Sequence, residues 1–140
     1  MPSKQTVRKA RQELSEGKSP KTAAGEFVHE EIEHVRQGKH GVRSPRQAIA
    51  IGLSEARRRG IPVPPPRKNA SAATKKKAKR DYEKGQSSTP SAKKTSSERS
   101  KARPQALQRE PKNTASHAAL SRQAKSAVKR RRSTSSRNAA

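Results

Sequence analysis

Large apolar side chains are too few in this chain, and too unevenly placed, to support one extended core. Leu, Ile, Val and Phe account for 15 of the 140 residues, about 11%, whereas a highly charged chain with less than roughly 20% usually stays unfolded. When the single Tyr is included, twelve of these sixteen residues precede residue 66. A hydrophobic core is therefore expected only in the first half of the chain.

Positive charge has the opposite distribution. Residues 1–66 contain 13 Lys or Arg and 7 Asp or Glu, a net charge of +6, whereas residues 67–140 contain 22 and 4, a net charge of +18. Between them lies the sequence IPVPPPRK, whose prolines end a helix and favour an extended backbone. We therefore divide the chain into a helical module (1–61), a Pro-rich linker (62–68) and a tail rich in Lys, Arg, Ala and Ser (69–140).

Apolar residues at helical spacing predict helices at residues 6–16 and 22–37. The second is the clearest amphipathic helix, because its apolar stripe from Ala24 to Val35 faces away from a side rich in glutamate. A third helix follows. The prediction is an all-α fold, with a small module of two to three helices at about residues 5–61.

The third helix, residues 45–60, has the most complete end signals in the chain. Ser44 can cap its first turn and Pro45 suits the first helical position. Gly60 suits the left-handed position after the last turn. Gly52 lies on the side expected to face the second helix, where it would permit a close approach.

The other side of the third helix has two interpretations. Gln47, Ile51, Ser54 and Arg58 lie there together. Either the chain itself buries Ile51, or this side faces a partner, as in a helix-turn-helix pair on a duplex. The eight-residue connection before the third helix is longer than the usual turn of that motif, which favours the first interpretation.

The tail is predicted to be long, basic and mostly disordered. Its few apolar residues cannot offset roughly 1–2 kcal/mol of backbone entropy per ordered residue. Residues 72–84 and 116–132 are rich in Ala, Lys and Arg, which favour helix. These two segments are expected to become helical when a polyanion screens their charge.

The formal net charge of +24 indicates a polyanionic partner. Lys and Arg bind nucleic-acid phosphates regardless of base sequence, and one Phe with one Tyr is too little for a base-stacking surface. We therefore predict non-specific, electrostatic binding of duplex DNA by a nucleoid-associated or histone-tail-like protein. Two alternatives stay open: binding of structured RNA, and a protein-interaction adaptor that uses the helical module, with the tail as a non-specific anchor.

The residues expected to contact phosphates are the cations at the end of the third helix and in the basic blocks of the tail. They are Arg57, Arg58, Arg59, Lys75, Lys76, Lys77, Lys79, Arg80, Lys93, Lys94, Lys125, Lys129, Arg130, Arg131 and Arg132.

No catalytic, cofactor or metal site is predicted from the sequence, and no small-molecule substrate. The chain has no Cys, which excludes thiolate zinc sites. In HEEIEH, His29 and His34 are five residues apart, about 140° around a helix, so both cannot reach one metal ion. No apolar run is long enough to span a membrane, and the expected location is the cytoplasm.

The turn Gly38–Gly41 and the helix Gln47–Arg57, which reads QAIAIGLSEAR, are the most specific elements of the sequence. With the Ala/Lys/Arg-rich tail, they resemble a family of short, strongly basic bacterial proteins of unknown function. The resemblance covers about residues 18–68 well and the tail loosely. It implies a bacterial source and an association with nucleic acid, and so a cytoplasmic location in a bacterial nucleoid, but it brings no active site.

Overall fold

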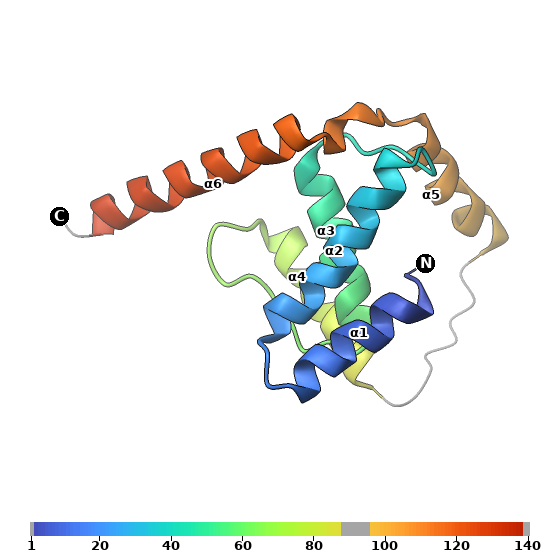
Figure 1. The fold of residues 1–140 in the computed structure, drawn as a ribbon, viewed down its shortest axis with the longest axis horizontal. Helices are drawn as coiled ribbons and strands as arrows, with labels where there is room; N and C mark the ends of the chain where they lie inside the picture. Colours follow the sequence, from blue (N-terminus) through green and yellow to red (C-terminus); the bar gives the residue numbers. More distant parts are fainter. Residues whose placement is uncertain (1, 88–95, 139–140) are drawn as a thin grey trace.

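The structure is a computed structural model, and it describes residues 2–87 and 96–138. These residues form helices and connecting segments and contain no strand, so the prediction of an all-α protein is confirmed. The elements are α1 (Lys4–Ser15), α2 (Pro20–Arg36), α3 (Pro45–Arg58), α4 (Ala72–Gln86), α5 (Ser97–Arg109), the short 3-10 helix η1 (Asn113–Ala115) and α6 (His117–Asn138) (Figure 1).

The prediction of a long, mostly disordered tail is wrong. Three helices and η1 make up most of the described part of the tail. Ala, Lys and Arg favour helix, and Ser71 caps α4 by accepting a hydrogen bond from the Thr74 N–H at 3.2 Å. The composition argument also treated the tail as an isolated segment. In the structure α4 packs on α3, and η1 packs on α2 and α3, so the module supplies the buried surface that the tail lacks.

The core consists of two groups of buried side chains. The first joins α1, α2 and α3 to the segment after α3, and its largest fully buried members are Phe27 and Ile61. The second contains Val35, Val42 and Ala48 together with Ala115 of η1. Ala115 is fully buried, so a residue of the tail completes the core of the module.

The ends of α3 agree with the prediction. The Ser44 hydroxyl oxygen accepts a hydrogen bond from the Gln47 N–H at 3.4 Å, and Pro45 occupies the first turn. Gly60 has a φ of 87°, in the left-handed region. There the Ile61 N–H donates to the Ala56 carbonyl at 3.1 Å, which closes the end of the helix.

The α2–α3 contact depends on Gly52, as the sequence suggested. A Cβ atom at this position would lie 2.7 Å from the Cα atom of Val28, a separation that real Cβ atoms do not adopt. The neighbouring atom is backbone, so it cannot move aside without a shift of the whole helix.

We expect Gly52→Ala to lower the free energy of unfolding by about 1–3 kcal/mol, the usual cost of overpacking a core, although Ala is the better helix former. Gly25→Ala in α2 is the matched control, because nothing lies within 4 Å of a Cβ atom there. This control is expected to be neutral or stabilising. Urea unfolding of both variants checks the prediction, and equal stabilities would contradict it.

Candidate nucleic-acid interface

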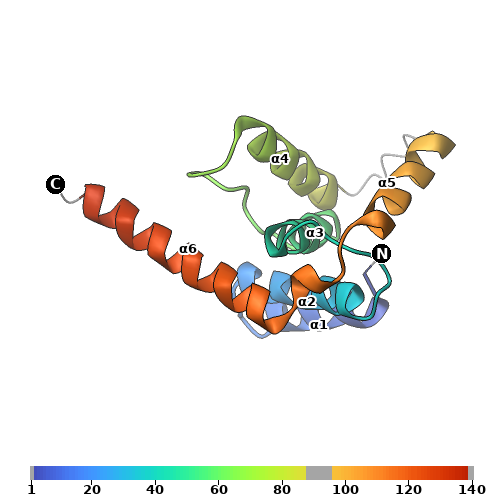
Figure 2. The same ribbon diagram turned by 90° about the horizontal axis from the view of Figure 1, so that it is seen from above.

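Among the α-helices that the structure describes, α6 is the one that contains basic residues and no acid. Residues 117–138 contain seven Lys or Arg and no Asp or Glu. Only the first turns of α6 lie near α3 and η1, and the rest of the helix projects from the body of the molecule (Figures 1 and 2). The Lys and Arg side chains at residues 122–132 of α6 are exposed and therefore open to a large ligand.

Four of these cations form a stripe along one side of α6. Arg122, Lys125, Lys129 and Arg132 follow one another at spacings of three, four and three residues, which places them on one helix face. All four are exposed. At 1.5 Å per residue the α6 stripe is about 15 Å long, and a helix of this kind fits the major groove of a DNA duplex.

The helix α4 presents a second basic surface. Lys76, Lys79 and Arg80 are exposed on its outer side. The nearby acid on that side, Glu83, has its carboxylate oxygen 3.8 Å from the Lys79 ammonium nitrogen. The remaining acid, Asp81, is only 5% exposed and faces the module.

Asp81 joins α4 to the side of α3 that the sequence left open to two interpretations. The Ser54 hydroxyl donates a hydrogen bond to Oδ2 of Asp81 at 2.6 Å, and the Arg58 Nε–H donates to Oδ1 at 2.8 Å. Burial by itself raises the pKa of Asp81, but these hydrogen bonds and the charge of Arg58 outweigh it and hold the pKa below its usual value. The α4 helix thus covers this part of the side that a partner was expected to contact.

The other two residues of that side also have partners within the chain. Ile51 is half-buried against the core group that contains Ala115. The side-chain oxygen of Gln47 accepts a hydrogen bond from the Arg43 N–H at 2.7 Å, which extends the cap of α3. In this structure the chain itself contacts all four residues of the side.

Arg57 is buried, whereas a residue that contacts phosphate has to be at the surface. We expected it at the surface, but it is 8% exposed, and its guanidinium donates to the carbonyl oxygens of Val63 at 3.1 Å and Pro64 at 3.3 Å. It therefore holds the Pro-rich segment against α3. Arg58 and Arg59 are exposed.

The structure describes most, but not all, of the tail residues that we expected to contact phosphates. Those on α4 and α6 are exposed, apart from Lys75, which is half-exposed. They lie on two helices, α4 and α6, that are well separated in the structure (Figure 2). Lys93 and Lys94 lie outside the described residues.

Backbone contacts fix the start of α6 on the module. The Gly41 N–H donates to the Leu107 carbonyl and the Val42 N–H to the Pro111 carbonyl, both at 2.8 Å. The Thr114 hydroxyl donates to the Val42 carbonyl at 2.6 Å. The α6 helix therefore leaves the body from a defined point.

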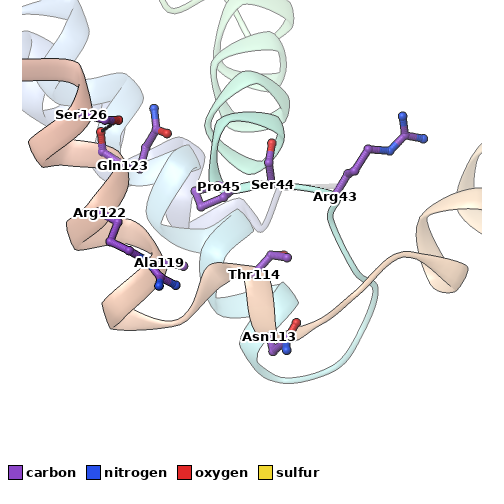
Figure 3. A pocket seen from close by; sticks show the side chains of 9 residues that line it. All are labelled: Arg43, Ser44, Pro45, Asn113, Thr114, Ala119, Arg122, Gln123 and Ser126. Carbon is purple, nitrogen blue, oxygen red and sulfur yellow. Dashed lines mark hydrogen bonds between the residues drawn. The ribbon is translucent and has the colours of Figure 1, made fainter. Parts of the chain in front are cut away.

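A pocket of about 520 Å³ lies at that point, between the first turns of α6 and the start of α3 (Figure 3). Arg122 lines it from α6 and Arg43 from the connection before α3. Arg43 extends away from α6 (Figure 3), and its guanidinium contacts the Glu110 carboxylate at 3.1 Å. The two guanidinium groups therefore do not converge on one anion.

A separate cluster of ionisable side chains lies at the end of α2. Glu31, His34 and His40 each place one potential metal-ligating atom within 4.8 Å of the others. Burial lowers the pKa of His34. Burial also raises the pKa of Glu31, and the charge of His40 offsets this only in part. The sequence analysis missed this cluster because it paired His34 with His29 and not with His40.

Comparison with known proteins finds a similarity to one family and indicates no function. Residues 14–69 match a family of unknown function (DUF6496). This agrees with the expected resemblance to an uncharacterised family, and the match includes α2, α3 and the Glu31–His40 cluster, but not α4, α5 or α6. No curated protein and no solved structure matches the chain. None of the described helices is long and apolar enough to cross a membrane.

Proposed function

We propose that this protein binds duplex nucleic acid, with DNA as the main ligand, through phosphate contacts from α6 and α4. The observation that carries the proposal is the α6 stripe, four exposed cations on one face of a projecting helix without acids. The location that suits this role is a bacterial nucleoid.

Binding of this kind is independent of base sequence. Phosphate contacts position a protein on a duplex, whereas specificity needs polar side chains at base edges. The α6 stripe consists of Lys and Arg, which neutralise phosphates regardless of base sequence, and it has no Asn or Gln with which to read adenine. We therefore expect similar affinities for duplexes of unrelated sequence.

The side of α3 that a protein partner would need is occupied by α4, η1 and the cap of the helix itself. A protein-interaction adaptor that uses this side would first have to displace α4. Phosphate binding needs no such rearrangement, because the cations of α4 and α6 already face solvent.

The test is a salt titration of the full chain with duplex DNA, structured RNA and single-stranded DNA. If six to ten phosphates are contacted, affinity for duplex DNA is expected to fall by about 10³ to 10⁵ between 50 and 200 mM salt. Binding to duplex DNA that does not depend on salt would contradict the proposal. If structured RNA binds more tightly than duplex DNA at every salt concentration, the main ligand is RNA and the proposal for DNA is wrong.

A further inference from the structure

The end of α2 and the turn after it bring together one carboxylate and two imidazoles. Glu31 and His34 are three residues apart on α2, so their side chains share one face. The chain then reverses at Gly38, which has a φ of 74°. The Lys39 N–H donates to the His34 carbonyl at 3.0 Å, and this turn returns His40 to Glu31 and His34.

The carboxylate in this cluster lacks a full set of partners. Glu31 is 4% exposed, and among the described residues its Oε1 atom accepts no hydrogen bond. The imidazole of His40 is close to it, with its Nε2 atom 3.4 Å from Oε1. A buried carboxylate oxygen without a hydrogen bond is costly, and binding a metal ion is one of the few ways to compensate it.

His40 is oriented as metal-binding histidines usually are. Its Nδ1 atom lies 3.2 Å from the Gly41 carbonyl oxygen. A carbonyl can only accept, so Nδ1 carries the proton and the lone pair of neutral His40 is on Nε2, the atom nearest Glu31. A backbone carbonyl that fixes the ring through its other nitrogen is a common outer partner of a histidine ligand.

We propose that Glu31, His34 and His40 bind a divalent transition-metal ion, with Zn²⁺ as the best match. Two imidazoles and one carboxylate suit Zn²⁺ better than Mg²⁺ or Ca²⁺, which prefer oxygen ligands only. With bonds of about 2.0–2.2 Å in a tetrahedron, ligand atoms are about 3.4 Å apart, the separation already found between His40 and Glu31. Water takes the fourth position.

A metal ion here would clamp the turn at residues 37–41 to α2. The residues directly after this turn contact the tail: the Gly41 N–H donates to the Leu107 carbonyl and the Val42 N–H donates to the Pro111 carbonyl. The site would therefore stabilise the same connection that holds the start of α6. This inference does not depend on nucleic-acid binding.

The experiment uses the full-length protein after removal of metals with a chelator. Calorimetric titration with ZnCl₂ is expected to show one saturable equivalent and a rise in melting temperature. Co²⁺ is expected to give the visible absorption of a tetrahedral site. Glu31→Gln, His34→Ala and His40→Ala should each weaken the affinity by more than about 100-fold, since even loss of an outer partner costs 10- to 100-fold.

The matched control is His29→Ala with His117→Ala, because both imidazoles are exposed. This double variant is expected to bind Zn²⁺ like the unaltered protein. The proposal is overturned if the unaltered protein binds no saturable equivalent, or if only the control variant loses binding. Glu31→Gln keeps the shape of the side chain, and a variant that is helical by circular dichroism yet retains full affinity would overturn it as well.

Discussion

Neutralising the α6 stripe is expected to remove most of the affinity for duplex DNA. In the variant with Arg122, Lys125, Lys129 and Arg132 replaced by Gln, four phosphate contacts are lost. Each contact contributes about 0.9 to the slope of log affinity against log salt, so the slope is expected to fall by about 3.6. If the affinities of the two proteins are equal at 1 M salt, the same relation gives a loss of about 4 × 10³-fold at 0.1 M salt.

A control variant separates the effect of the position of these cations from the effect of net charge. The matched control replaces Lys4, Arg8, Arg11 and Lys21, which are all exposed on α1 and α2, by Gln. Both variants have a net charge lower by four. We expect the control to retain most of the slope of log affinity against log salt. Equal losses of affinity in the two variants would show that binding depends on net charge and not on the position of the cations.

Local sequence signals predicted the ends and the close packing of α3 well because they act over a few residues. The cap at Ser44 and the left-handed turn at Gly60 each depend on neighbours within one helical turn. The same holds for the small residue Gly52, whose position on the helix face follows from spacing alone. These features need no knowledge of the rest of the chain.

The docking of the tail was not predicted, because the composition argument counted large apolar residues only. The α4 helix packs through Ala78, Asp81 and Gly85, which are spaced at three and four residues. Ala78 and Asp81 are buried, and a Cβ atom at Gly85 would collide with the Arg57 carbonyl. This stripe of small residues around one acid in a basic helix is a signal that the sequence contains.

The candidate metal cluster was missed for a different reason. The spacing of Glu31 and His34 is visible in the sequence, but the position of His40 depends on how the chain turns at Gly38. Its contact with Glu31 is therefore a property of the turn and not of helix periodicity. A search limited to one helix face cannot find it.

Removing the Asp81 carboxylate is expected to release α4 from the module. Hydrogen bonds to a charged group contribute about 1.5–3 kcal/mol, and the Arg58 side chain is 42% exposed, which weakens its share. We therefore expect Asp81→Ala to destabilise the docked state of α4 by about 2–3 kcal/mol. Hydrogen exchange should then show loss of protection in the amides of α4 while those of α2 stay protected.

Glu83→Ala is the matched control on the same helix. It changes the net charge by the same amount, but Glu83 is exposed and its only described ion pair is with Lys79 at 3.8 Å. We expect unchanged protection of α4 in this variant. Equal exchange in the two variants would mean that Asp81 does not hold α4.

The dependence on pH separates the charge of Asp81 from its shape. The folded-state pKa lies below the reference value of 3.8, so the stabilisation is fully present above that value and is lost as the pH falls through the folded-state pKa. Asp81→Asn lacks this ionisation. The difference in α4 protection between the unaltered protein and Asp81→Asn should therefore be constant from pH 7 to about 5 and shrink below about 4. A difference that stays constant down to pH 3 would show that the charge of the Asp81 carboxylate does not hold α4 on α3.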